Sequence, residues 1–271
     1  MLTPAPVTPA GAWSKASSRL PAAAHPHRTR ASYLHCEASA AVALGAALAV
    51  CRSARSARKS ALQPLPPAEG SAKSSPFRFS TLANWLVPGR LMVGRYPLLE
   101  AQKEEGQKHL RQLVTEAKIT TFVCLQSEVP AQSDLRSWPP AGIKVKSRRC
   151  LPYARMAQQF AGSSSKLSFL HEPLDDLEVP GSERLSDFTL QLEERVKSGE
   201  KLLLHCMGGR GRSNLVAGCL LAKLHSLSAD EASAYLQFAY DSRDYDNCVV
   251  PETERQRATL QAFCDGYALA T

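Results

Sequence analysis

Long apolar runs are scarce in this sequence of 271 residues. The main run, Ala40 to Cys51, is 12 residues, half of them alanine, and too short to span a bilayer, so no transmembrane segment is expected. Cys-x-x-Cys pairs are also absent. The eight cysteines, at positions 36, 51, 124, 150, 206, 219, 248 and 264, form no regular framework, which favours a reducing compartment over secretion. No zinc-type ligand spacing occurs, so we expect no metal site.

Acidic residues are almost absent from residues 1–75, where Glu37 and Glu69 stand against nine Lys or Arg. The segment is rich in Ala, Ser, Pro and Arg and shows no sustained helical or strand period. Because organelle transit peptides have this composition, we predict a disordered leader, with a transit peptide for a plastid or mitochondrion followed by a linker. The alanine run and the basic residues after it suit a second targeting element or a weak membrane-surface helix. The alternative is a disordered tail with no address, on a cytoplasmic protein.

The net charge of +8 belongs to this leader, because residues 76–271 hold 24 Lys or Arg against 23 Asp or Glu. A folded part without excess positive charge is not expected to bind nucleic acid. The apolar share of 44% supports a real core, and residues 76–271 are long enough for one domain. We expect this domain to be monomeric.

Strand-like and helix-like stretches alternate from Phe77 onward. Within Asn84–Pro97 we expect a turn followed by a short strand. Further strands are expected at Ile119–Leu125, which is buried, at Ile143–Arg149, which has the alternation of an edge strand, and at Leu167–His171 and Leu202–Leu204. Helix patterns cover 98–118, which Gly106 is expected to bend or split, a segment ending at Gly199, one beginning at Leu215, one opened by a capping box at 228–231, and one beginning at Pro251. Residues 153–165 are expected to form a short helix and an exposed loop. The alternation predicts an α/β fold, a three-layer sandwich with a mostly parallel central sheet flanked by helices.

The strongest signal lies between the last strand and its helix, in His205-Cys206-Met207-Gly208-Gly209-Arg210-Gly211-Arg212-Ser213. A glycine-rich turn there points backbone N–H groups and the positive end of a helix dipole into one concavity, which suits a phosphate dianion. These donors and the Arg212 guanidinium should stabilise a Cys206 thiolate, the nucleophilic form of cysteine. The planar fork of Arg212 can also hold two phosphate oxygens. A phosphate site at the carboxyl end of the central strand is therefore expected.

The pattern His-Cys-x5-Arg-Ser resembles the signature of the cysteine-dependent protein tyrosine and dual-specificity phosphatase superfamily. HCMGGRGRSNLVAGCLL is most similar to small members of the cyclin-dependent-kinase-associated phosphatase type, and Asn84–Pro97 resembles the opening of the same family. The resemblance implies the protein tyrosine phosphatase-like fold and hydrolysis of phosphoprotein, with dual specificity, through a phosphocysteine. It implies no metal and no cofactor. The implied phosphate-binding residues are Met207, Gly208, Gly209, Arg210, Gly211 and Arg212.

A general acid must come from a separate loop, because the leaving oxygen needs a proton. Pro173-Leu174-Asp175-Asp176 follows a strand 30 residues before Cys206, and phosphatases of this superfamily carry their acid in a similar place. Asp176 aligns best with that acid and Asp175 is the rival. Either one is alternatively an ordinary turn aspartate.

Three residues of the loop have secondary roles to be tested. Ser213 is expected to hydrogen-bond the cysteine sulfur, with N-capping of the next helix as the alternative. His205 is expected to order the loop through hydrogen bonds and not to act as a base. Arg210 either adds a cationic rim for acidic or multiply phosphorylated substrates or is a solvated surface arginine.

Two residues outside the loop are weaker candidates. Pro251-Glu252-Thr253-Glu254-Arg255-Gln256 resembles a stretch of related small phosphatases that would bring Gln256 to the site, but an ordinary helix start is favoured. Cys124 is a candidate partner for oxidised Cys206 in a disulfide, although a buried core cysteine is the commoner role.

Other functions fit parts of this pattern. A phosphoglucan or phosphoinositide phosphatase would use the same loop, but no carbohydrate- or lipid-binding domain is visible. A non-catalytic phosphate-binding module usually lacks the cysteine, arginine or acid, and all three are present here. A rhodanese-like sulfurtransferase does not require this arginine and upstream aspartate together. A metal-independent protein phosphatase is therefore the leading interpretation.

Overall fold

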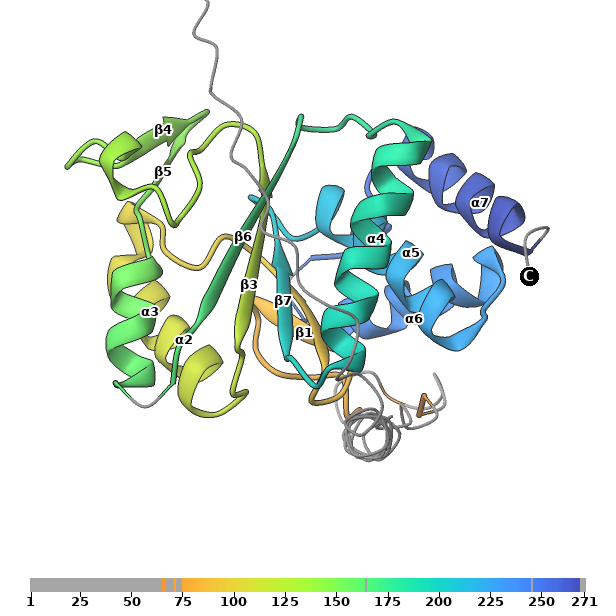
Figure 1. The fold of residues 1–271 in the computed structure, drawn as a ribbon, viewed down its shortest axis with the longest axis horizontal. Coiled ribbons are helices and arrows are strands. Elements are labelled where there is room, and N and C mark those ends of the chain that lie inside the picture. Colours follow the sequence, from red (N-terminus) through yellow and green to blue (C-terminus); the bar gives the residue numbers. More distant parts are fainter. Residues whose placement is uncertain (1–64, 67–70, 72–74, 164, 245, 269–271) are drawn as a thin grey trace, which may run out of the picture. The chain divides into compact units, whose positions relative to one another are not determined.

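The computed structural model describes residues 65–66, 71, 75–163, 165–244 and 246–268 (Figure 1). The predicted leader lies outside the described residues except for four positions near its end. Contacts with the folded part include Leu65, which packs against the core, and Pro66, whose carbonyl accepts from the Tyr235 hydroxyl at 2.8 Å. None of the helices in the described ranges has the length and apolar content needed to cross a membrane.

A mixed sheet of five strands forms the centre, in the order β1-β2-β7-β3-β6. β2 (Leu91–Gly94), β7 (Leu202–His205), β3 (Thr121–Gln126) and β6 (Ser168–Leu174) run parallel, and only β1 (Ala83–Val87) is antiparallel. β7 is the middle strand, and all four of its residues are buried, as its leucine run predicts. The predicted mostly parallel sheet is confirmed.

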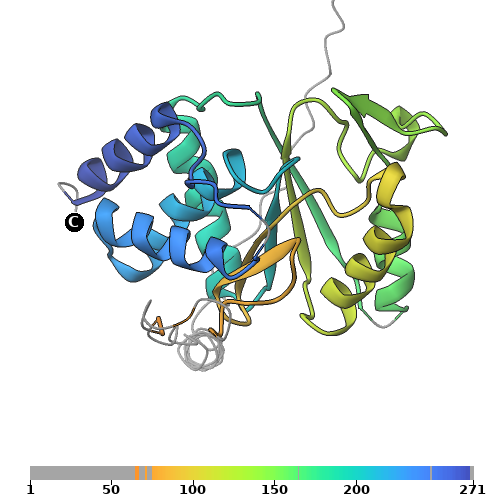
Figure 2. The same ribbon diagram turned by 180° about the vertical axis from the view of Figure 1, so that it is seen from behind.

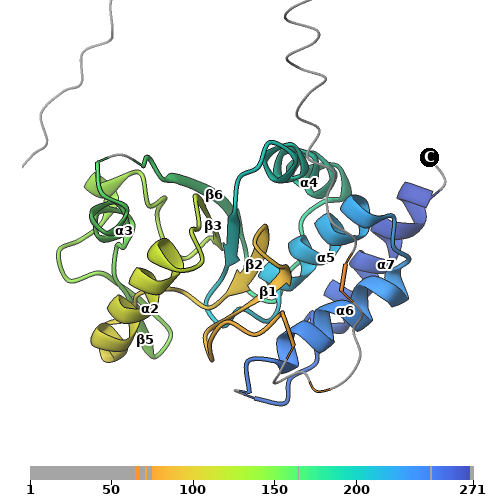
Figure 3. The ribbon, with the colours of Figure 1, turned by 90° about the horizontal axis from the view of Figure 1, so that it is seen from below.

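Helices cover both faces of this sheet, as Figure 3 shows most plainly. One face carries α2 (Lys103–Thr115) and α3 (Ala154–Ala161), which are yellow and green in Figure 2. The other carries α4 (Ser182–Lys197), α5 (Arg212–His225), α6 (Ala229–Asp241) and α7 (Glu254–Ala268). The three-layer α/β sandwich is therefore confirmed. The capping box at Ser228 and the end of α4 before Gly199 also agree with the sequence prediction.

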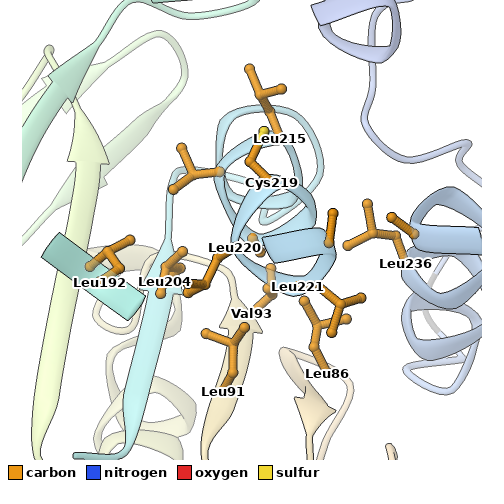
Figure 4. Close-up of a cluster of buried hydrophobic side chains, with 14 of the residues drawn as sticks. Leu86, Leu91, Val93, Leu192, Leu204, Leu215, Cys219, Leu220, Leu221 and Leu236 are labelled. Carbon is orange, nitrogen blue, oxygen red and sulfur yellow. The ribbon is translucent and has the colours of Figure 1, made fainter. Parts of the chain in front are cut away.

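Two apolar clusters, one on each side of the sheet, hold these layers together. Residues of β7 alternate between them: Leu202 and Leu204 face the cluster around α5, and Leu203 faces the cluster of α2 and α3. In the α5 cluster, Leu220 and Leu221 pack with side chains of the sheet and of α6 (Figure 4). Eleven residues of α5 are buried, so the helix that follows the glycine-rich loop is fixed on nearly all sides.

The segment predicted as one edge strand, Ile143–Arg149, is instead a hairpin. β4 (Ile143–Val145) pairs antiparallel with β5 (Arg148–Cys150) in a separate sheet of two strands. Lys146 turns the chain with a left-handed backbone (φ 54°). The alternation of side chains was correct, but a pattern with a period of two residues does not reveal a reversal in its middle. Asn84–Pro97 likewise holds two strands, β1 and β2, and not a turn with one strand.

The first predicted helix is shorter than expected and is not interrupted by glycine. A 3-10 turn, η2 (Glu100–Gln102), precedes α2, and α2 continues through Gly106 without a split. A Cβ atom at Gly106 would lie 2.8 Å from the Pro97 carbonyl oxygen. Gly106 therefore serves a close helix–loop contact. Another 3-10 turn, η3 (Leu135–Ser137), lies in the loop predicted at 127–142.

Two element ends also differ from the prediction. β6 continues past His171 through Pro173, which is tolerated because β6 is an edge strand and proline lacks only an outward N–H. Pro251 does not open the last helix: it follows a cis peptide bond with Val250, and α7 begins at Glu254. α5 begins at Arg212, three residues before the predicted Leu215, so Arg212 lies in its first turn.

Candidate active site

The glycine-rich loop lies at the carboxyl end of the middle strand, where β7 leads into α5 (Figure 1). Gly211 is the N-cap residue of α5, and no side chain caps that helix. The free N–H groups and the positive end of the helix dipole are thus available to an anion in the loop. Ser213 therefore does not cap α5, and the alternative role given to it is wrong.

Cys206 is 3% exposed and receives two contacts through its sulfur. The Gly209 N–H donates to Sγ at 3.3 Å, and the Ser213 hydroxyl lies 3.4 Å from Sγ. Both contacts suit a sulfur that carries negative charge, because a thiolate accepts hydrogen bonds.

The loop is fixed from behind by two side chains that sequence analysis did not identify. The Asn214 amide donates to the carbonyls of Gly209 (2.8 Å) and Arg210 (3.0 Å), and Arg243 donates to the Gly209 carbonyl (3.2 Å). Because a trans peptide holds C=O and the next N–H on opposite sides, these bonds direct the N–H groups of Arg210 and Gly211 the other way. Holding the carbonyls outward therefore aims amide donors inward.

Arg243 is a buried cation that ties the loop to the sheet. It also donates to the Asn84 side chain (2.5 Å) and to the Val93 carbonyl (2.9 Å). Burial lowers the pKa of Arg243 to about 10, so the group remains charged at neutral pH. Its three acceptors come from β1, β2 and the loop, which fixes these segments relative to one another.

Close packing explains why glycine occupies two loop positions. Gly209 has φ +67°, and a Cβ there would lie 2.5 Å from the Gly94 carbonyl oxygen. A Cβ at Gly211 would lie 2.9 Å from the side-chain oxygen of Gln256. Gln256 is fully buried and packs against the loop, so the favoured interpretation of its segment as only an ordinary helix start understates its position.

Arg212 is 2% exposed and is held by carboxylates. Its Nη1 donates to Glu128 (2.6 Å) and to the Leu174 carbonyl (2.9 Å), and its Nη2 contacts Glu128 and Asp176, each at 3.1 Å. Burial lowers the pKa of Arg212, but the hydrogen bond to Glu128 and nearby negative charges outweigh burial and raise it overall. Glu128 was missed, although it follows the predicted strand β3 and thus lies at the same edge of the sheet as the loop.

Asp176 joins the loop to the β4–β5 hairpin. One carboxylate oxygen pairs with Arg212 and the other with Lys146 at 2.6 Å. Burial raises the pKa of Asp176, but Lys146 and Arg212 together lower it below its usual value. Asp175 is exposed and does not line the cavity that contains Cys206. The geometry thus favours Asp176 over its neighbour.

His205 is completely buried behind the loop. Its Nε2 lies 2.5 Å from the Tyr153 hydroxyl. Burial, with a smaller effect of His171, lowers the pKa of His205 to about 3, so the ring is neutral at ordinary pH. This environment does not suit a base. The hydrogen bond ties His205 to Tyr153 and not to the loop, so the role of His205 in ordering the loop stays a prediction.

Arg210 does not form a free cationic rim. It pairs with Glu252 at 2.9 Å and Asp246 at 3.8 Å, and it donates to the Cys248 sulfur at 3.2 Å. Carboxylates thus offset its charge, although it still lines the cavity. Neither proposed alternative, the free rim or the solvated arginine, describes this arrangement.

Cys124 lies in the core on the other side of the sheet from Cys206. It belongs to the α2–α3 cluster, whereas Cys206 belongs to the α5 cluster. Burial raises the pKa of Cys124 to about 12, so this thiol stays protonated. The position fits the core cysteine and disfavours the disulfide.

The side chains described above surround one cavity of about 340 Å³. Its walls include Cys206, Arg212, Asp176 and Glu128 on the sheet side, and the hairpin turn 145–148 beside them. A nucleophilic sulfur, a bidentate cation and a carboxylic acid in one cavity are the groups that cysteine-dependent phosphoryl transfer requires.

Comparison with known proteins agrees with this class. Residues 80–258 match the family described as "PTP-SAK: Swiss Army Knife protein, DSP-PTPase phosphatase domain". This match covers more than half of the chain. The chain therefore belongs to the family of DSP-PTPase phosphatase domains, and the resemblance seen in the loop is confirmed.

The curated relatives and the solved structures share 36% or less of their residues with this chain over the aligned parts. Cyclin-dependent kinase inhibitor 3 of Sus scrofa is 36% identical over 99 residues, which is 36% of this chain and 44% of that protein, and the Rattus norvegicus protein gives the same figures. This chain thus spans less than half the length of these relatives. Similar structures include Tk-PTP in the active form (23% identity, TM-score 0.44, 68% of this chain and 96% of that chain) and kinase associated phosphatase (23%, 0.44, 66% and 87%).

Proposed function

We propose that this protein hydrolyses phosphomonoesters of proteins, with dual specificity, through a phosphocysteine intermediate. The observation that supports this most is the shared cavity, in which Cys206 receives an amide hydrogen bond and lies with Arg212 and Asp176. Family membership supports the reaction class.

The proposed first step is in-line attack of the Cys206 thiolate on phosphorus. The P–O bond to the substrate breaks, and Asp176 gives its proton to the leaving oxygen. The amide N–H groups of the loop and the Arg212 guanidinium hold the three phosphoryl oxygens as their charge spreads. Glu128 keeps the guanidinium in plane for this contact.

In the proposed second step, water attacks the phosphocysteine and Asp176 takes its proton. The S–P bond breaks, and the sulfur leaves as a thiolate. The Ser213 hydroxyl, 3.4 Å from Sγ, donates to the departing sulfur and lowers the barrier to its release. Arginine and amide groups supply the positive field, so the mechanism requires no added cation.

The direct test is hydrolysis of p-nitrophenyl phosphate by the full chain in EDTA. We expect turnover in the wild type and none in Cys206→Ser, because serine lacks a stabilised anion at this position. Cys264→Ser, which removes a thiol from α7 away from the cavity, is the control and should remain active. Turnover retained by Cys206→Ser would contradict the mechanism.

Substrate identity can be approached by trapping. Asp176→Ala should lower kcat by about a hundredfold to ten-thousandfold, because general-acid assistance is lost while Cys206 and Arg212 remain. Such a variant should retain phosphoprotein that mass spectrometry can identify. Asp175→Ala is the matched control. An equal loss of kcat in Asp175→Ala would reject the assignment of the acid.

A further inference from the structure

A second hollow adjoins the active cavity at the β4–β5 hairpin. Its volume is about 270 Å³. Ser147 and Arg148 line both the active cavity and this hollow, so the two spaces share the hairpin turn as a wall. The other walls are Arg95, Leu99, Ala101, Gln102 and Arg149.

The lining of this hollow is positively charged. It contains three arginines and no carboxylate among the described lining residues. Arg95 is only 5% exposed, and Arg149 pairs with Glu100 at 3.0 Å. Glu100 thus offsets the charge of Arg149, and Arg148 is the guanidinium of this lining that suits an anion with several acceptor oxygens.

Arg148 differs from the other cations that line the active cavity. Arg210 pairs with Glu252, Arg212 with Glu128, and Lys146 with Asp176. Arg148 is exposed, and no carboxylate of the described chain lies within ion-pair distance of it. When one phosphate group of a substrate occupies the loop, the Arg148 guanidinium, whose charge no carboxylate offsets, is available to a second phosphate group.

We propose that Arg148, on the wall shared by the active cavity and the adjoining hollow, binds a second phosphate group of the same substrate molecule. The inference rests on the proposed function, and it names the substrate class as a doubly phosphorylated protein segment. One phosphate enters the loop at Cys206, and the other reaches across the hairpin turn to Arg148. The planar guanidinium then makes charge-assisted bonds to two phosphate oxygens.

The surface favours a protein segment over a lipid headgroup. Residues 76–271 hold 24 basic and 23 acidic residues, which provides no general attraction to an anionic membrane. Among the described large apolar side chains that are exposed, only Leu177 lines the cavity. A single leucine offers little area for insertion among acyl chains.

The test compares kcat/KM for a synthetic peptide with one phosphoresidue and for the same peptide with a second phosphoresidue at several neighbouring positions. The wild type should prefer at least one doubly phosphorylated form. Arg148→Ala should lower the ratio of doubly to singly phosphorylated turnover about tenfold, the usual worth of one charge-assisted contact. Arg148→Lys should restore only part of the ratio, because lysine is a point charge.

Lys166→Ala is the matched control, since it removes an exposed positive charge just before β6, at the opposite end of the sheet from Cys206. It should leave the ratio unchanged. A ratio unaltered in Arg148→Ala, with the singly phosphorylated peptide still hydrolysed, would overturn the subsite and leave the proposed function standing. No hydrolysis of any phosphomonoester by the wild type would overturn the function itself. An Arg148-dependent preference seen only with vesicles containing phosphatidylinositol bisphosphate would overturn the peptide assignment.

Discussion

Asp176 contacts two cations at once, and this contact couples the acid to the substrate. Without substrate, Arg212 and Lys146 keep its pKa low and its carboxylate charged. A phosphate dianion in the loop competes for Arg212 and adds negative charge beside the carboxyl. Both effects raise the pKa of Asp176 and favour the protonated acid that the first step needs.

Removing Lys146 should therefore shift the pH dependence of catalysis. In Lys146→Met the pKa of Asp176 rises, because a partner of its charged form is lost. A general acid loses activity as pH rises through its pKa, so the descending limb of kcat against pH should move to higher pH. The measurement is a pH–rate profile with p-nitrophenyl phosphate. Lys144→Met, an exposed neighbour outside the cavity lining, should leave the limb in place; equal profiles for both variants and the wild type would reject this coupling.

The loop between β7 and α5 depends on the absence of a side chain at Gly209. Gly209→Ala places a methyl group against the Gly94 carbonyl oxygen and Arg243. Gly162 provides a matched control, because it has a similar φ (+74° against +67°) and nothing within 4 Å of its Cβ position.

Gly162→Ala should lower the free energy of unfolding by about 1 kcal/mol, from backbone conformation alone. Gly209→Ala should lower it by about 1–3 kcal/mol more, from overpacking, and should also reduce kcat because the amide donors shift. Urea denaturation and initial rates measure the two effects. Equal losses of stability in the two variants would show that the contact with Gly94 is unimportant.

Local patterns predicted the elements whose signals lie within one short segment. The run Leu202–Leu204, the glycines after it and the arginine at 212 define strand, turn and helix without reference to the rest of the chain. Contacts made across the fold were not accessible. The residues next to Arg243 in the sequence do not predict that its guanidinium donates to the Gly209 carbonyl, because that contact depends on how α6 packs against the sheet. The reversal at Lys146 was missed because a hairpin and a single strand have the same alternation.

At the scale of the whole chain, residues 80–258 match the phosphatase family and residues 1–75 differ from them in composition. We propose that residues 1–75 carry a transit peptide and a linker. A chain of residues 60–271 should match the full chain in kcat. A chain of residues 76–271 should also be active but unfold a few degrees lower, because it lacks Leu65 and the hydrogen bond between Tyr235 and Pro66.

Thermal unfolding and initial rates of the three chains test where the phosphatase domain begins. The cellular distribution of fluorescent fusions with and without residues 1–75 tests whether this segment is a transit peptide. Loss of activity in the 60–271 chain would show that the boundary is wrong. A fusion that distributes identically with and without the segment would reject the transit peptide.

Hydrogen bonds from Asn214 and Arg243 to the Gly209 carbonyl fix the conformation of the phosphate-binding loop before a ligand binds. Tetrahedral oxyanions such as vanadate then lose only their own freedom on binding, with little further ordering of the chain. Differences in inhibitor potency should consequently appear as differences in residence time, while capture rates remain much alike.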